Sequence, residues 1–160
     1  MFSRFFSKQK LRIFAPVSGE VLSLDDVPDP VFSQRMLGDG VAIMPSGGNI
    51  HAPCSGTIIH LANTKHAIGL RTDDNTELLI HVGLETVSLG GQGFTACVKA
   101  GEKVEKGQLL LKVDWDFLQE NAASLVTPLV ITNSAEKTVQ LEQVQHCEQG
   151  KTVLMTTFSN

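Results

Sequence analysis

The sequence GTIIHLANTKHAIGLRTDDNTELLIHV, residues 56–82, contains three short apolar runs separated by turn-forming residues. The runs are Gly56–Leu61, His66–Arg71 and Glu77–Val82, and an Asp-Asp-Asn turn at residues 73–75 separates the last two. Short runs rich in β-branched residues and bounded by Asn, Asp or Gly are typical of strands joined by tight turns. The segment therefore predicts three consecutive strands of an antiparallel sheet.

The rest of the chain repeats this pattern from Ile13 onward. The further strands that it predicts are Gly19–Leu24, Val41–Met44, Gln108–Val113, Leu129–Thr132 and Thr152–Thr157. Only Asp114–Ala123 has a helical pattern, with Asp114 as N-cap, and a weaker helical turn begins near Ser134. We expect an all-β protein, an antiparallel β-sandwich of the barrel-sandwich type with one or two short helices.

Two segments of the chain resemble each other. APVSG at residues 15–19 recurs as APCSG at residues 52–56, and each copy leads into a predicted strand. Pro and Gly set a turn in each copy, so we expect two similar corners where the chain enters a strand.

Composition limits the classes of function. The chain has 160 residues, 42% hydrophobic and 19% charged, which suits one globular domain. Its net charge of −4 argues against a nucleic-acid partner, because phosphate binding requires clustered Lys and Arg. The three cysteines form no CxxC pair and are expected to be free thiols, and no apolar run approaches the ~20 residues of a membrane span.

The N-terminal residues 1–12, MFSRFFSKQKLR, form a segment of their own, and residues 13–160 form the expected domain. Phe2, Phe5 and Phe6 share one side of a helix, and Arg4, Lys8, Lys10 and Arg12 supply positive charge. This flexible, amphipathic segment has two interpretations. It either folds onto an anionic membrane surface or is a frayed tail with incidental aromatic residues.

His81 is the most unusual of the five histidines, because it lies within the apolar run LLIHVGL at residues 78–84. Gly83 leaves space beside it for another molecule to approach the ring. Thr64 and His66 lie two residues apart on a predicted strand, so a hydroxyl and a second imidazole point the same way. Such a group could bind Zn²⁺, serve in acid–base chemistry or handle a phosphoryl group.

The histidine run LLIHVGLETV at residues 78–87 closely resembles the active-site signature of glucose-type enzyme IIA domains of the bacterial phosphoenolpyruvate-dependent sugar phosphotransferase system. Five further segments resemble that family in the same order: APVSGE (15–20), VPDPVF (27–32), GDGVAI (38–43), TKHA (64–67) and TPLVITN (127–133). The chain departs from the family at Asn75, where glycine is usual. It also has Leu61, Ile68 and Leu79 where relatives often have aromatic residues near the site.

The resemblance implies a cytoplasmic, monomeric phosphocarrier, with a peripheral place at the inner face of the membrane if residues 1–12 bind lipid. His81 would be phosphorylated by the phosphocarrier HPr, with His66 as its neighbour in the active site. The acceptor would be a cysteine on the IIB domain of a glucose-family sugar permease. The His66 N–H and the Thr64 hydroxyl are the candidate donors to the transferred group.

The resemblance also implies a docking face. Asp29, Asp39 and Glu85 would surround an apolar patch that includes Phe32, and this surface would suit a basic, apolar partner. The unphosphorylated face would also serve regulatory protein targets. No cofactor is required, but His66 and His81 are the candidate ligands of a zinc ion completed by a partner's carboxylate or by water.

Three other classes of protein have features in common with this sequence. A biotinyl or lipoyl carrier is suggested by the double turn VKAGEKVEKGQ at residues 98–108, but the chain lacks the expected lysine setting. A LytM-type zinc peptidase requires a His-x-His pair, which is absent from the sequence. A regulatory binding module without turnover stays open, and incubation with phosphoenolpyruvate, enzyme I and HPr followed by mass spectrometry would distinguish it.

Overall fold

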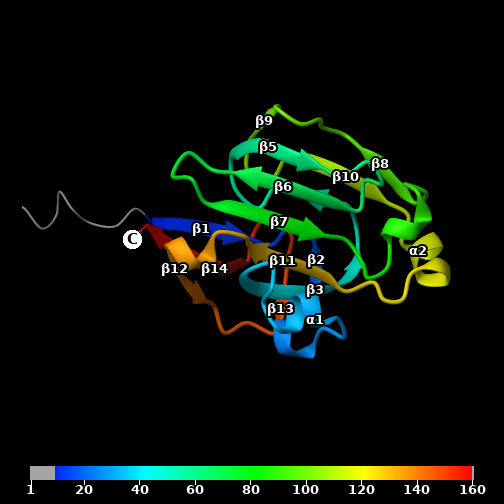
Figure 1. Cartoon of the computed structure of the whole chain (residues 1–160), viewed down its shortest axis with the longest axis horizontal. Helices are drawn as coiled ribbons and strands as arrows, with labels where there is room; N and C mark the ends of the chain where they lie inside the picture. Colours follow the sequence, from blue (N-terminus) through cyan, green and yellow to red (C-terminus); the bar gives the residue numbers. More distant parts are fainter. Residues whose placement is uncertain (1–9, 160) are drawn as a thin grey trace, which may run out of the picture.

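The computed structural model describes residues 10–159 of the chain (Figure 1). Its strands are β1 (Lys10–Phe14), β2 (Ser18–Ser23), β3 (Asp39–Gly47), β4 (Ile50–His51), β5 (Gly56–Leu61), β6 (Ala67–Arg71), β7 (Glu77–His81), β8 (Phe94–Ala96), β9 (Lys103–Val104), β10 (Leu109–Val113), β11 (Thr127–Ile131), β12 (Lys137–Leu141), β13 (His146–Cys147) and β14 (Val153–Ser159). The helices are α1 (Pro30–Ser33) and α2 (Trp115–Asn121), and three 3-10 turns are η2 (Leu24–Asp26), η3 (Val87–Leu89) and η4 (Ser134–Glu136).

The strands form three antiparallel sheets. The largest has eight strands in the order β13-β2-β3-β11-β7-β6-β5-β9, and the two smaller sheets have the orders β1-β14-β12 and β4-β10-β8. The described residues therefore confirm the expected antiparallel all-β fold with two short helices. No helix of this part of the chain is long and apolar enough to cross a membrane.

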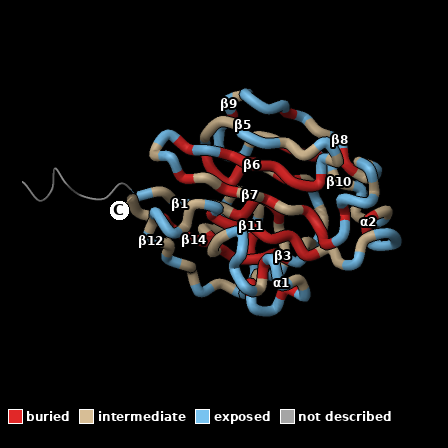
Figure 2. Tube along the Cα trace, viewed as in Figure 1, coloured by how far each residue is buried: buried red, intermediate tan, exposed pale blue. Residues whose placement is uncertain are grey.

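The strands β5, β6 and β7 form the meander that the segment 56–82 predicts. Ile68 of β6 stands opposite Ile80 of β7, and Leu129 of β11 faces Ile80 from the other side. All three side chains are almost completely buried, and Figure 2 shows β6 and β11 largely buried along their lengths. Complete burial of an isoleucine or leucine side chain contributes roughly 1.5–3 kcal/mol to the stability of the fold. The meander is therefore a stable support for the strand ends that carry the candidate site.

The two similar corners lie side by side. Phe14 N–H donates to Pro53 O at 3.0 Å, and His51 N–H donates to Pro16 O at 2.9 Å. A Cβ on Gly19 would lie 2.1 Å from Met44 O, and one on Gly56 would lie 2.4 Å from Arg71 O. The repeated glycine is thus required because a neighbouring strand's backbone passes too close for any side chain.

The structure differs from expectation at the N-terminal boundary. β1 begins at Lys10 and pairs with β14, so residues 10–12 belong to the sheet rather than to a flexible segment. The membrane interpretation of residues 1–9 lies outside the described residues. Asp114 is the N-cap of α2 as expected, accepting from Phe117 N–H at 3.1 Å, but the helix is shorter than Asp114–Ala123.

Candidate active site

His81 is the last residue of β7, and the chain turns sharply after it. Its Nδ1 lies 2.9 Å from Gly83 O. A carbonyl oxygen can only accept a hydrogen bond, so Nδ1 carries the proton and Nε2 keeps its lone pair. Gly83 has φ +75°, and a Cβ there would lie 2.7 Å from Thr86 Cγ2. This glycine therefore permits the turn and close packing inside the chain, rather than leaving open space beside the ring.

His66 lies in the turn before β6, not on the strand as the sequence predicted. Lys65 adopts a left-handed backbone, φ 59°, and this bend brings Thr64 Oγ1 to 2.5 Å from His66 Nδ1. The two side chains thus converge as expected, although strand alternation is not the cause. Val82 N–H donates to His66 O at 2.7 Å, which fixes this turn against the end of β7.

The two imidazoles are packed edge to face. Their ring centroids lie 4.9 Å apart with an interplanar angle of 78°. Both Nδ1 atoms have partners, whereas no hydrogen bond within residues 10–159 involves either Nε2. Neither Nε2 is among the buried unpartnered atoms of the described residues, so both are accessible to another molecule.

Phe32 of α1 packs against His81, with ring centroids 5.0 Å apart. It is only 2% exposed, so the expectation that it forms part of an exposed apolar patch is wrong. It supports the imidazole from within the protein. The large apolar side chains that are exposed among the described residues are Val31, Met36, Leu37, Met44, Ile59 and Val87.

Burial keeps both rings neutral near pH 7. Loss of solvation, with smaller contributions from the neighbouring His81 and His60, lowers the pKa of His66 to about 4. Loss of solvation also lowers the pKa of His81, opposed by the Gly83 carbonyl and by the charge of Asp29. A neutral imidazole with a free Nε2 lone pair is a competent nucleophile.

Two of the three expected docking carboxylates, Asp29 and Glu85, lie together, and the charge of Asp29 acts on His81. Asp29 caps α1 by accepting from Val31 N–H at 3.0 Å, and with Glu85 it lines a cavity of about 480 Å³.

Three positions have aliphatic residues where the family often has aromatic ones. Of these, Ile68 is buried in the core, whereas Leu61 and Leu79 are half-buried.

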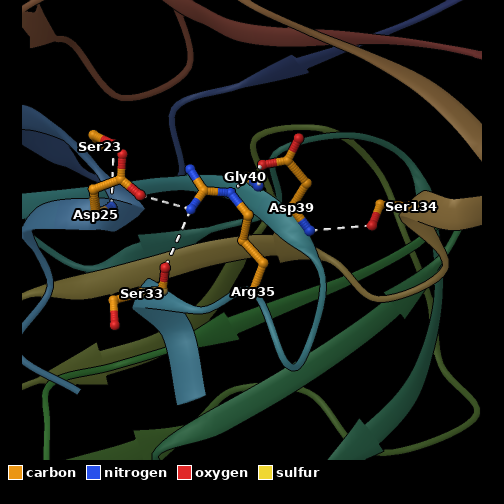
Figure 3. Close-up of polar contacts among 7 residues, drawn as sticks. All are labelled: Ser23, Asp25, Ser33, Arg35, Asp39, Gly40 and Ser134. Carbon is orange, nitrogen blue, oxygen red and sulfur yellow. Dashed lines mark hydrogen bonds and ion pairs between the residues drawn. The ribbon is translucent and has the colours of Figure 1, made fainter. Parts of the chain in front are cut away.

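Asp39 belongs to a different cluster, which the sequence analysis missed (Figure 3). The Arg35 guanidinium donates to Asp25 at 2.7 Å and to Asp39 at 3.3 Å, and also to Ser33 O at 3.2 Å. Arg35 thereby joins η2, the end of α1 and the start of β3. Arg35 itself has a left-handed backbone, φ 55°, a conformation that no sequence pattern around it predicts.

The described residues contain no group of three or more His, Cys, Asp or Glu side chains placed to hold a metal ion. His66 and His81 could offer two Nε2 ligands, but a zinc ion takes about four ligands, and another molecule would have to provide the rest. The interface zinc site remains a prediction.

Comparison with known proteins identifies the family. Residues 11–137 match the family model described as the phosphoenolpyruvate-dependent sugar phosphotransferase system, EIIA 1. The chain is 45% identical to the PTS system glucose-specific EIIA component of Halalkalibacterium halodurans, covering 94% of this chain and 87% of that protein. It is 42% identical to the component of the same description from Buchnera aphidicola, covering 98% of each.

A solved structure of glucose permease IIA from Mycoplasma capricolum matches with a TM-score of 0.88 and 38% identity, covering 92% of this chain and 96% of that one. In Staphylococcus carnosus, a glucose-specific EIICBA component is 46% identical over 89% of this chain, which spans 21% of that longer protein. The chain belongs to the sugar phosphotransferase system EIIA 1 family. It is a phosphotransferase component that carries a phosphoryl group.

Proposed function

We propose that His81 carries the phosphoryl group on Nε2, accepting it from phospho-HPr and passing it to the IIB domain of a glucose-family sugar permease. The observation that carries this proposal is the bond from His81 Nδ1–H to Gly83 O. It leaves the Nε2 lone pair free, accessible and next to a second imidazole.

In the acceptance step, the Nε2 lone pair forms the bond to phosphorus while the bond between phosphorus and the donor breaks. The shared electron pair of the broken bond leaves with the donor. His81 is neutral before the step, so no proton has to be removed from Nε2 first. In the second step, a thiolate of the IIB domain attacks phosphorus, and the imidazole of His81 leaves with Nδ1 still protonated.

His66 supplies a hydrogen bond to the transferred oxygens. If the Thr64 hydroxyl donates to His66 Nδ1, the proton of the neutral ring lies on Nε2, which then points a donor at the phosphoryl group. Loss of such a preorganised donor costs on the order of 2–4 kcal/mol of barrier. Thr64 is therefore a positioning residue that fixes the tautomer of His66, rather than a direct donor to phosphate.

The surface around the histidines suits a basic partner with an apolar contact patch. Asp29 and Glu85 supply negative charge, and Val31 of α1, Met36 and Val87 of η3 are exposed. The longer EIICBA relative supports a permease domain as one partner, since the same region occurs there within a larger chain. We also propose that the protein acts as a monomer in the cytoplasm. The same face around the histidines would bind regulatory protein targets.

Transfer kinetics test the roles of the two histidines. The wild type, His66→Gln and Thr64→Val are first loaded from phospho-HPr and then mixed with a purified IIB domain. His66→Gln should load but pass the group on more slowly by about 30-fold or more, the rate equivalent of 2 kcal/mol. Thr64→Val should show a smaller defect of the same kind. Equal onward transfer by wild type and His66→Gln would contradict the role given to His66.

A further inference from the structure

A second cavity lies at the opposite end of β7 from His81. Its volume is about 540 Å³, and it is bordered by residues 10–12 of β1, Cys54 and Ser55, residues 72–74 and Lys106. Residues 72–74 precede β7, whereas His81 ends it, so roughly 16 Å of strand separates the two sites. In Figure 1, β1 and the β6–β7 turn lie at the left, away from α2. Its volume falls within the ~300–1,000 Å³ typical of small-ligand pockets.

Three cationic side chains line this cavity. Lys10, Arg12 and Lys106 make no ion pair with an acidic side chain among the described residues. The Lys106 ammonium lies 3.6 Å from the centroid of the Phe14 ring, a contact that holds it near the cavity without neutralising its charge. The cavity wall therefore has positive charge available for an anionic ligand.

The backbone of β1 adds hydrogen-bond donors. Among residues 10–159, β1 is an edge strand that pairs only with β14, and Phe14 N–H points away from that partner to Pro53 O. Backbone groups alternate in direction along a strand, so the N–H groups of Arg12 and Lys10 face the same free side. This free edge borders the cavity.

Carboxylates and hydroxyls occupy other parts of the wall. Asp74 is ionised, since hydrogen bonds from Thr72 and Thr76 and the charge of Lys137 lower its pKa despite partial burial. Asp73 is exposed and makes no hydrogen bond or ion pair within residues 10–159. Burial raises the pKa of Cys54 to about 12, so its thiol contributes no charge.

We propose that this cavity binds a sugar phosphate. Arg12, Lys10, Lys106 and the free edge of β1 would hold the phosphate, and Asp73 with the hydroxyl of Ser55 would take the sugar hydroxyls. A small inorganic anion would leave the carboxylates of the wall facing a like charge. A cationic ligand would be repelled by the three positive side chains. A ligand with one anionic group and several neighbouring hydroxyl donors satisfies both parts of the wall.

The test is a titration of the isotopically labelled full chain with glucose 6-phosphate, followed by amide chemical shifts. The amides of Leu11, Ser55, Thr72 and Lys106 should shift saturably, while glucose should cause no shift and inorganic phosphate should bind at least tenfold more weakly. Arg12→Ala and Lys106→Ala should each weaken binding about tenfold, as expected for loss of a charge-assisted hydrogen bond. Lys99→Ala is the matched control, an exposed lysine outside the cavity that should bind as the wild type does.

Asp73→Asn separates the two halves of the ligand. Removal of this carboxylate should strengthen the binding of inorganic phosphate and weaken that of the sugar phosphate, so the ratio between them falls. Equal affinity for phosphate and sugar phosphate in the wild type would overturn the sugar part of the assignment. Absence of saturable shifts, or an equal effect of Lys99→Ala, would overturn the site. Labelling of His81 is measured separately in each variant, so failure of this site and failure of the phosphocarrier role are distinguishable.

Discussion

The low pKa of His66 makes the stability of the fold dependent on pH in a way that one substitution should remove. The ring has a pKa of about 4 in the folded protein, against 6.5 in the unfolded chain. Below pH 6.5 the unfolded chain therefore binds a proton that the folded protein does not. Stability falls as the pH is lowered through this window, and the loss is complete once the pH lies below the folded pKa.

The size of the effect follows from these two values. At 1.36 kcal/mol per unit of pKa, the full loss is up to about 3 kcal/mol, with about 1.4 kcal/mol lost by pH 5.5 and about 2.5 kcal/mol by pH 4.5. This is a large fraction of the roughly 5–15 kcal/mol that stabilises a domain. In His66→Gln the side chain does not titrate, so its own contribution to the pH dependence disappears.

Urea unfolding of both proteins between pH 7 and pH 4.5 measures the difference directly. Other groups, including Asp25 and Asp74, titrate in both proteins and cancel in the comparison. We expect the wild type to lose about 2.5 kcal/mol more than His66→Gln over this range. Parallel stability curves, or an NMR titration that places the His66 pKa near 6.5, would refute the burial argument.

Three further results are expected. Gly83→Ala should destabilise the fold by about 1–3 kcal/mol and slow labelling, because position 83 combines a positive φ with a close contact to Thr86. Gly90→Ala has a similar φ but open space around the new Cβ, so it should destabilise the fold less and label normally. Urea unfolding and labelling rates in the reverse order would contradict this. Phe32→Ala should lower the free energy of unfolding by about 3 kcal/mol and shift the NMR signals of the His81 ring, because the Phe32 side chain is buried against that imidazole. Unchanged His81 signals would show that the contact is absent. Removal of residues 1–9 leaves β1 intact and should reduce binding to anionic vesicles without affecting labelling of His81. Unchanged vesicle binding would favour the interpretation of this segment as a frayed tail.

The main sheet could be predicted from the sequence because its strands are apolar and separated by strong turn signals. Gly56–Leu61 is identical in prediction and structure, and the predicted 66–71 and 77–82 strands differ by one residue at one end. β1 could not be recognised as a strand because Lys10 and Arg12 flank Leu11 on an exposed edge, and the same basic residues fit an amphipathic surface segment. Strands of two or three residues, such as β4 and β13, carry too little pattern to detect.

The candidate site shows where local reasoning ends. The two-residue spacing of Thr64 and His66 correctly predicted that their side chains converge. The cause is the left-handed backbone of Lys65, which places the Thr64 hydroxyl against His66 Nδ1, and the sequence did not predict it. Phe32 was expected at the surface because its segment matches the docking region of the family, yet its side chain points to His81. The Arg35 cluster joins residues only four and ten positions apart, but they belong to separate short elements, and no sequence motif shows how the intervening turns bring them together.

The central claim is that the phosphoryl group resides on Nε2 of His81, and labelling of variants tests it most directly. The wild type, His66→Gln and His81→Ala are incubated with phosphoenolpyruvate, enzyme I and HPr, and the modified atom is assigned by NMR. We predict an acid-labile, alkali-stable group on His81 Nε2 in the wild type and in His66→Gln, and no label on His81→Ala. Label retained by His81→Ala but lost from His66→Gln, or a group found on Nδ1 of His81, would contradict the account.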